Sequence, residues 1–237
     1  MTFLRKLKFV FIVSISLPSL YACALYGYET TYSAKSTEVW VVDADTNKPI
    51  EGVTAVAHWE LSAGEMSARS RLVQLQIMEA VTDENGRLYF PAWGPKQNPT
   101  AIGYLDWNDP EIILFKTGYK AEFLRNYPLS QPRLGALRYS DWDGKTVKMQ
   151  KVVSDKSYLE NRRYMNYLID TTLTGEAKAC DWKHAPKTIA ALLDEERLLG
   201  EKAYTTSSLV STLRSNERYF SDNGCGSARA FLEGLRR

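Results

Sequence analysis

Histidine is the side chain most often used for acid–base chemistry and zinc binding, and it occurs only twice in this chain of 237 residues, as His58 and His184. A catalytic zinc site needs about three protein ligands, and neither H-E-x-x-H nor H-x-x-E is present. His58 falls in an alternating stretch and His184 precedes a proline, so solvated or hydrogen-bonded side chains explain both. The sequence therefore predicts no catalytic histidine and no metal site.

Covalent catalysis would need a serine or cysteine beside a general base. The G-x-S-x-G elbow that presents a serine in many hydrolases is absent, and so is a glycine-rich phosphate loop. Because serines are many and histidines few, no spacing supports a Ser-His-Asp triad. We expect a protein that is not an enzyme and needs no cofactor; an enzyme with an unrecognised site remains the alternative.

Asp-Trp pairs are the feature closest to a binding site: two of three lie in predicted loops, near a further tryptophan in PAWGP. A tryptophan face beside a carboxylate can stack on a sugar and accept its hydroxyl hydrogen bonds. The candidate ligand-binding residues are Trp93, Trp107, Trp142, Asp106 and Asp141. Oxygen ligands for calcium would come from these aspartates with Asn108, Asp109 and Asp143, but the spacing lacks a full calcium loop. Alternatively, the tryptophans pin long loops onto the fold.

The N-terminus resembles an export signal. Basic residues Arg5, Lys6 and Lys8 precede a short apolar run, 9–17, and small residues follow at 22–24. A membrane-spanning helix needs about 20 apolar residues, which this run does not reach. Two cleavage sites are possible. "ACA" fits release after Ala24, whereas "LYAC" resembles a bacterial lipoprotein signal in which Cys23 is lipidated.

The cysteine count favours the lipoprotein interpretation. Of three cysteines, a lipidated Cys23 leaves Cys180 and Cys225 as a pair in an oxidising compartment. Their bond would close a loop of roughly 45 residues and contribute roughly 4 kcal/mol in the chain-entropy model. Ala24 after the lipidated cysteine resembles lipoproteins sorted to an outer membrane. We expect a signal peptide at 1–22 and a polar tether at 23–36.

Residues 37–152 have the pattern of short strands joined by turns. TEVWVVDA is β-branched and aromatic, and VTAVAHWEL alternates, which predicts a half-buried strand at 53–61. Asp45, Asn47, Pro49 and Gly52 supply the turn between them. Further strands are expected at 77–82, 87–90, 111–119 and 143–153, with an Asn-Gly hairpin turn at 85–86. Without a helical period between the strands, an antiparallel sandwich is predicted.

Three motifs resemble those of the carboxypeptidase regulatory-like family: VVDADTNKPIEGV, then TDENGR, then the Gly-Tyr turn of IILFKTGY. The resemblance implies a transthyretin-like β-sandwich over 37–152, with insertions at 62–76 and 119–142. In that family the module is an accessory, and no peptidase domain follows it here. Related sandwiches include intradiol dioxygenases, whose two histidines lie close in sequence, unlike His58 and His184. The resemblance implies little about function.

The segment 153–237 is predicted to be helical. Ser157 and Glu160 fit a capping box, and the first helix should end near Gly175. Pro186 suits the first turn of a second helix, whose apolar stripe is Ile189, Leu192, Leu193 and Leu199. A third helix is expected at 208–219, and Ser227 should cap a last one ending at 235. Such short helices must bury their stripes on each other or on the sandwich.

Composition excludes several classes of protein. Hydrophobic residues make up 44%, charged residues 24%, and the net charge is +2, so there is no basic surplus for nucleic acid. The sequence indicates an exported, outer-membrane-anchored lipoprotein that faces the periplasm and acts as an interaction or scaffold module. Its expected partners are the membrane, through the lipid anchor, and an envelope protein or glycan. A carbohydrate- or peptidoglycan-binding module is the second hypothesis, and soluble periplasmic or secreted forms remain open.

Overall fold

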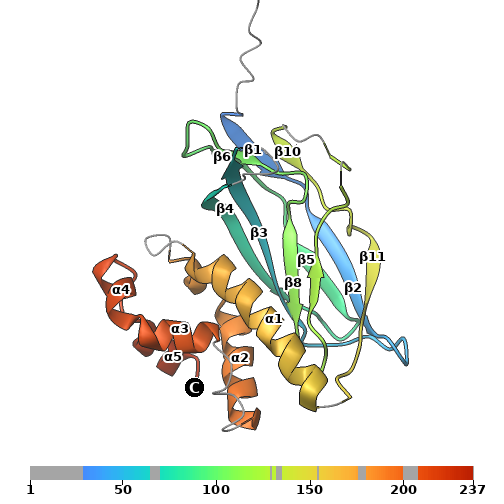
Figure 1. Ribbon diagram of the computed structural model, residues 1–237. Helices are drawn as coiled ribbons and strands as arrows, with labels where there is room; N and C mark the ends of the chain where they lie inside the picture. Colours follow the sequence, from blue (N-terminus) through green and yellow to red (C-terminus); the bar gives the residue numbers. More distant parts are fainter. Residues whose placement is uncertain are drawn as a thin grey trace, which may run out of the picture.

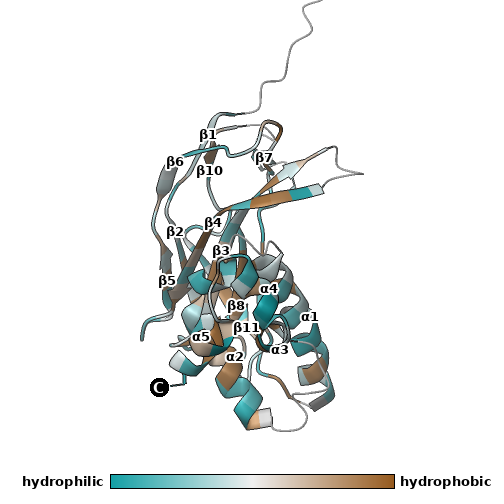
Figure 2. Ribbon diagram, turned by 90° about the vertical axis from the view of Figure 1, so that its left-hand side faces the viewer, coloured by the Kyte–Doolittle hydropathy of each residue, from teal (hydrophilic) through white to brown (hydrophobic). Residues whose placement is uncertain are grey.

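The computed structural model describes residues 29–64, 70–128, 130–131, 135–153, 155–175, 180–199 and 208–236. The predicted signal peptide, Cys23 and the first part of the tether lie outside these residues and stay predictions. Two β-layers and a layer of helices lie one behind another (Figure 2). The predicted fold class, mainly β with a sandwich followed by helices, is thereby confirmed. No described helix is both long and apolar enough to cross a bilayer.

One layer consists of two three-stranded sheets that continue one another (Figures 1 and 2). The first has the order β10 (Leu137–Arg138), β1 (Thr31–Ala34), β6 (Trp93–Gln97). The second has the order β11 (Lys145–Met149), β2 (Thr37–Asp43), β5 (Arg87–Phe90). Two expectations are corrected here: residues 31–34 of the expected tether form β1, and β11 pairs with β2 in parallel, so the sandwich is not purely antiparallel.

The central layer is a five-stranded sheet with the order β4-β3-β8-β9, in which β7 also pairs with β3. The strands are β3 (Thr54–Ala63), β4 (Ser70–Val81), β7 (Tyr104–Leu105), β8 (Glu111–Phe115) and β9 (Glu122–Leu124). The expected insertion at 62–76 is mostly strand, because β3 and β4 extend along each other as one long hairpin with two register shifts. The predicted strand at 77–82 is therefore only the end of β4.

Strand β3 shows how the layers fit together. Ala55, Ala57, Trp59 and Leu61 point into an apolar core between the two β-layers. Val56 and His58, on the opposite side, are also buried, because helices cover that side of the sheet. The prediction of a half-buried strand was wrong for this reason, although the assignment of residues to its two faces was right.

The turn between β2 and β3 is organised by Asp43, which sequence reasoning placed at the end of a strand. Its Oδ1 accepts hydrogen bonds from the backbone N–H groups of Asp45 (3.1 Å) and Thr46 (2.9 Å). The bond from the Thr46 N–H, with side-chain bonds from Lys151, Thr46 and Tyr119, holds the pKa of Asp43 below its usual range. Asn47 and Gly52 adopt positive φ of 54° and 72°, as the predicted turn requires.

The helical layer consists of α1 (Asp155–Thr174), the 3₁₀ turn η2 (Asp181–His184), α2 (Pro186–Leu199), α3 (Leu209–Ser215), α4 (Glu217–Asp222) and α5 (Ala228–Gly234). Helix α1 begins before Ser157, so the predicted capping box with Glu160 was wrong. The predicted third helix is divided at Asn216. Pro186 begins α2 as expected, and the Ser227 hydroxyl accepts from the Ala230 N–H as a cap.

A second apolar cluster holds the helices to the central sheet. Val56, Ile77, Ile113 and Phe115 of the sheet pack with buried residues of all five α-helices and η2. Cys180 and Cys225 form the expected disulfide, with their Cα atoms 5.4 Å apart, and so join the start of η2 to the loop before α5. The helices therefore form one side of a core to which the sheet supplies the other.

Candidate functional site

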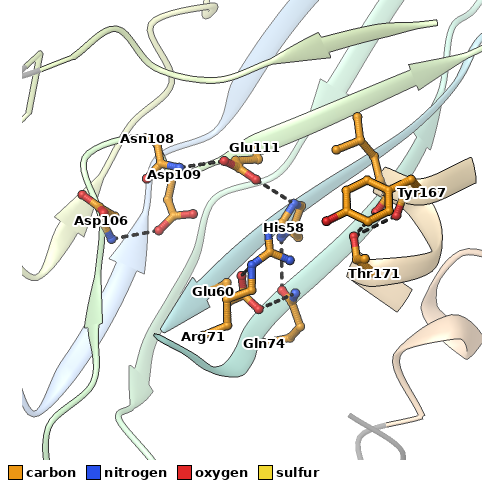
Figure 3. A network of polar contacts seen from close by, with 11 residues as sticks. His58, Glu60, Arg71, Gln74, Asp106, Asn108, Asp109, Glu111, Tyr167 and Thr171 are labelled. Atoms are coloured by element: carbon orange, nitrogen blue, oxygen red, sulfur yellow. Dashed lines mark hydrogen bonds and ion pairs between the residues drawn. The ribbon is translucent and has the colours of Figure 1, made fainter. Parts of the chain in front are cut away.

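The polar junction is a group of side chains on the helix-facing side of the central sheet, beyond the end of the second apolar cluster. It comprises His58, Glu60, Arg71, Gln74, Asn108 and Glu111. Strands β3 and β4 and the start of β8 supply most of them, because Glu111 pairs with His58 in register and Gln74 lies on the next strand. Figure 3 shows these side chains pointing toward one another beside the part of α1 that carries Tyr167 and Thr171.

His58 stands between two hydrogen-bond acceptors. The Gln74 amide donates from Nε2 to Glu60 Oε1 at 3.4 Å, which turns its Oε1 toward His58 Nδ1 at 3.2 Å. We therefore assign a proton to Nδ1. On the other side of the ring, Nε2 lies 3.5 Å from Glu111 Oε2. The side chain is 1% exposed, so it is hydrogen-bonded as one alternative predicted and not solvated.

Glu111, in the junction, and the neighbouring Asp109 have opposite shifts of pKa. Burial raises the pKa of Glu111, but the adjacent His58 ring and the hydrogen bond from Asn108 outweigh it and leave the pKa lowered. The Asn108 bond, from Nδ2 to Glu111 Oε1, is 2.6 Å long. Burial and the adjacent Glu111 charge raise the pKa of Asp109 well above its usual range. The site thus places an ionised carboxylate, Glu111, next to a carboxyl group, Asp109, that favours its protonated form.

Two cavities adjoin the junction, and Glu60 and Arg71 line both. The inner cavity, about 20 Å³, is lined by junction residues together with Ser62, Asp106 and Asp109. The outer cavity, about 140 Å³, extends to the end of α1 and to Asp181. Arg71 is paired with Glu60 at 3.1 Å, and its side chain is half exposed. Polar side chains from distant segments of the chain thus gather here around open volume.

The predicted LDWNDP site is a rigid loop. The fully buried Arg138 donates to the backbone oxygens of Leu105 and Asp106, the latter at 3.0 Å. The Asp106 carboxylate, itself buried, accepts from the Trp107 N–H at 2.7 Å. Among described residues, no three His, Cys, Asp or Glu side chains are grouped so as to hold a metal ion. Asp106 nevertheless faces the inner cavity, which the sequence did not reveal.

The three candidate tryptophans do not form one surface. Trp93 packs edge-on against the core residue Trp59, with ring centroids 5.3 Å apart. Trp107 is partly buried in the Arg138-bound loop. Trp142 alone pairs with an exposed aromatic side chain, that of Tyr127 at 6.3 Å, and is itself partly buried against the sandwich core. The structure therefore brings Trp142 together with a tyrosine that sequence reasoning missed.

The remaining predicted residues lie elsewhere. Asp141 accepts the Tyr127 N–H at 2.7 Å and so holds the aromatic pair in place. His184 is exposed on η2, next to the disulfide-bonded Cys180. Sequence alternation put His58 and Glu60 on one face, but Glu111 and Gln74 join them only through pairing with other strands. That pairing carries no local sequence signal.

Known proteins resemble this chain only weakly. No protein-family model matches it, and no curated protein matches its sequence. Among solved structures, 3-chlorocatechol 1,2-dioxygenase from Rhodococcus opacus 1CP matches with a TM-score of 0.29 and 15% identity, over 54% of this chain and 62% of that one. This chain thus spans less than two thirds of that dioxygenase.

Two further structures show the same weak likeness. The dioxygenase domain of a dioxygenase carbohydrate-binding protein fusion from Streptomyces sp. SirexAA-E has a TM-score of 0.25 and 14% identity, over 55% of this chain and 84% of that one. A 9R-lipoxygenase from Cyanothece has a TM-score of 0.24 and 12% identity, over 79% of this chain and 26% of that one. At these scores, none of the three bears on function.

Proposed function

We propose that this chain is a non-catalytic envelope lipoprotein, anchored through Cys23, that acts as an interaction or scaffold module at the periplasmic face of a membrane. The exposed side of α1 is the observation that carries the proposal. Tyr164 and Tyr167 lie one turn apart on this helix, 54% and 65% exposed, with the exposed Arg163 beside them. Tyrosine and arginine are enriched where protein interfaces gain most of their binding energy.

The buried side of the same helix explains why that surface is rigid. Ile169 and Leu173 are buried in the cluster that joins the helices to the central sheet. The helix therefore presents its tyrosines from a fixed backbone, which lowers the entropy lost on binding. A rigid aromatic face on α1 supports a docking role for the helical layer.

Site-specific photo-crosslinking in intact cells tests the proposal. A photoreactive phenylalanine analogue replaces Tyr164 or Tyr167, and Tyr89, an exposed tyrosine on β5 of the opposite layer, is the matched control. We expect a discrete adduct of higher mass from α1 and none from Tyr89. Absence of the α1 adduct, or the same adduct from Tyr89, contradicts the interaction role. Mass spectrometry of the mature N-terminus tests the anchor separately, since cleavage after Ala24 would remove Cys23.

Glycan binding is a second candidate, favoured by the aromatic pair of Tyr127 and Trp142. The Trp142 indole donates to the Arg125 backbone oxygen at 3.0 Å, and Lys145 Nζ lies 4.9 Å from the Tyr127 ring centroid and 5.7 Å from that of Trp142. A fixed aromatic pair with an ammonium group suits an anionic sugar. Calorimetric titration with soluble peptidoglycan fragments should show binding that Trp142→Ala abolishes and Trp107→Ala leaves intact. Binding that survives Trp142→Ala would exclude this surface.

A further inference from the structure

We propose that the polar junction and its two cavities form a binding site for a small organic cation, a short primary amine. The ammonium group would lie in the inner cavity, and the body of the ligand in the outer one. The site lies beside α1, whose Thr171 and Thr172 line the outer cavity, but neither cavity is lined by Tyr164, Tyr167 or the aromatic pair.

Volume sets the size of the ligand. The inner cavity, about 20 Å³, has room for one group the size of water, and an ammonium group is of that size. The outer cavity, about 140 Å³, is close to the roughly 150 Å³ that holds a benzene molecule in an engineered core. Leu72 and Val73 form an apolar part of its wall. A body of about four to six carbon or nitrogen atoms fits this pair of cavities.

Charge sets the sign of the ligand. Glu60 and Asp181 line the outer cavity, and Glu60, Asp106, Asp109 and Glu111 line the inner one. Against these acidic residues stand only Arg71 and His58 among the described residues that line the two cavities. Even with Asp109 protonated, the acidic groups outnumber the basic ones. Because a recessed group of like charges concentrates the opposite ion, the lining favours a cation.

Asn108 shows that the cation should be a hydrogen-bond donor. Its side chain is 6% exposed, and its Nδ2 donates to Glu111, which leaves Oδ1 as the end that accepts. This Oδ1 is buried and has no hydrogen-bond partner among the described residues, and Asn108 lines the inner cavity. A buried acceptor left unpaired destabilises the fold, so a ligand that donates a hydrogen bond to it is favoured. A primary ammonium carries three such donors, whereas a quaternary one carries none.

The lining distinguishes an organic cation from a metal ion. No three acidic, histidine or cysteine side chains in the described parts of the chain are arranged as metal ligands. The acceptors instead lie on different strands around the cavity, as suits an ammonium group that donates in three directions. The apolar part of the outer wall also has no role in binding a bare ion.

The test is a ¹H–¹⁵N NMR titration of the mature protein with n-butylamine hydrochloride. Two probes of similar size are the controls: butan-1-ol, which is neutral, and tetramethylammonium, which is charged but donates no hydrogen bond. We expect saturable shifts at Asn108, Glu111 and Thr172 with the amine, and affinity for it at least about tenfold higher than for either control. Equal affinity for the alcohol removes the role of charge, and equal affinity for tetramethylammonium removes the role of Asn108; either result overturns the proposal.

Variants locate the site. Asn108→Leu and Glu60→Gln should each weaken butylamine binding about tenfold, whereas Glu51→Gln, at an exposed turn far from the junction, should not change it. The probe comparison on the unaltered protein remains decisive if a variant does not fold. The assignment is contradicted if the shifts stay linear up to the highest amine concentration at which the protein remains soluble. It is also contradicted if Glu60→Gln leaves binding unaffected.

Discussion

The two faces of strand β3 are both buried, yet they are buried in different ways. Toward the other β-layer, Ala57, Trp59 and Leu61 pack in the apolar cluster of the sandwich core. Toward the helices, His58 and Glu60 meet acids, amides and an arginine. One face thus gains stability from excluded water, and the other depends on matching each polar group with a partner.

The interior of the helical layer also depends on paired polar groups, as the helix-facing side of β3 does. Arg162 of α1 and Glu195 of α2 are buried, with Nε and Oε2 3.0 Å apart but not aligned as a hydrogen bond. Burial raises the pKa of Glu195 despite this cation and the Tyr158 hydroxyl, which donates to it. The contrast implies that the sandwich core should tolerate changes of pH and suffer from lost volume, whereas the helical side should respond to lost charge.

Trp59→Ala gives the largest expected loss of stability. The side chain is 1% exposed and packs against Trp93, so its removal leaves a cavity in the apolar core. We expect the free energy of unfolding to fall by about 3–5 kcal/mol, measured by urea denaturation. The loss should be the same at pH 5 and pH 7. A strongly pH-dependent loss would break the distinction between the two faces.

Arg162→Met should cost about 3 kcal/mol, because it leaves Glu195 buried without its cation. The double variant Arg162→Met, Glu195→Leu should regain most of that stability, since both charges are then replaced by apolar groups of similar volume. Denaturation of the two variants and the wild type measures the difference. If the double variant is no more stable than the single one, the pair is not the source of the cost.

The apolar face of β3 was predictable from sequence, and the polar junction was not. Strict alternation assigned Trp59 and His58 to opposite faces, and Gly86, with φ of 70°, occupies the turn that Asn-Gly predicted. A Cβ at Gly86 would lie 2.4 Å from the Val41 backbone oxygen, so the turn demands glycine. Local patterns of this kind carry their own signal.

The covering of the second face has no such local signal. It depends on α1 and α2 folding back onto a sheet whose strands lie far earlier in the chain. His58 meets Glu111 only because β3 pairs with β8 across more than fifty residues, and sequence reasoning treated His58 as isolated. For the same reason, alternation alone suggested a face open to solvent.

Removing the disulfide should affect the two regions unequally. Cys180 and Cys225 lie 45 residues apart, both within the helical segment. Loss of a bond over such a loop typically costs about 2–4 kcal/mol. Hydrogen exchange of Cys180→Ser, Cys225→Ser should quicken in α3 and α5, while amides of β2 and β5 stay protected. Equal loss of protection in both regions would show that the layers unfold as one unit.

Glu111→Gln and Asp109→Asn should give the smallest effects, with opposite signs. The lowered pKa of Glu111 means that its contribution to stability is present above its unfolded pKa and is lost as the pH falls through its folded one. The raised pKa of Asp109 means that its contribution is present at low pH and is lost as the pH rises. Urea midpoints between pH 3 and pH 7 should therefore show Glu111→Gln least impaired in acid. Asp109→Asn should compare best with the wild type at neutral pH, because an amide does not bear the cost of ionising a buried carboxyl group. Parallel curves for the two variants would mean that the junction does not hold these carboxyl groups in different protonation states.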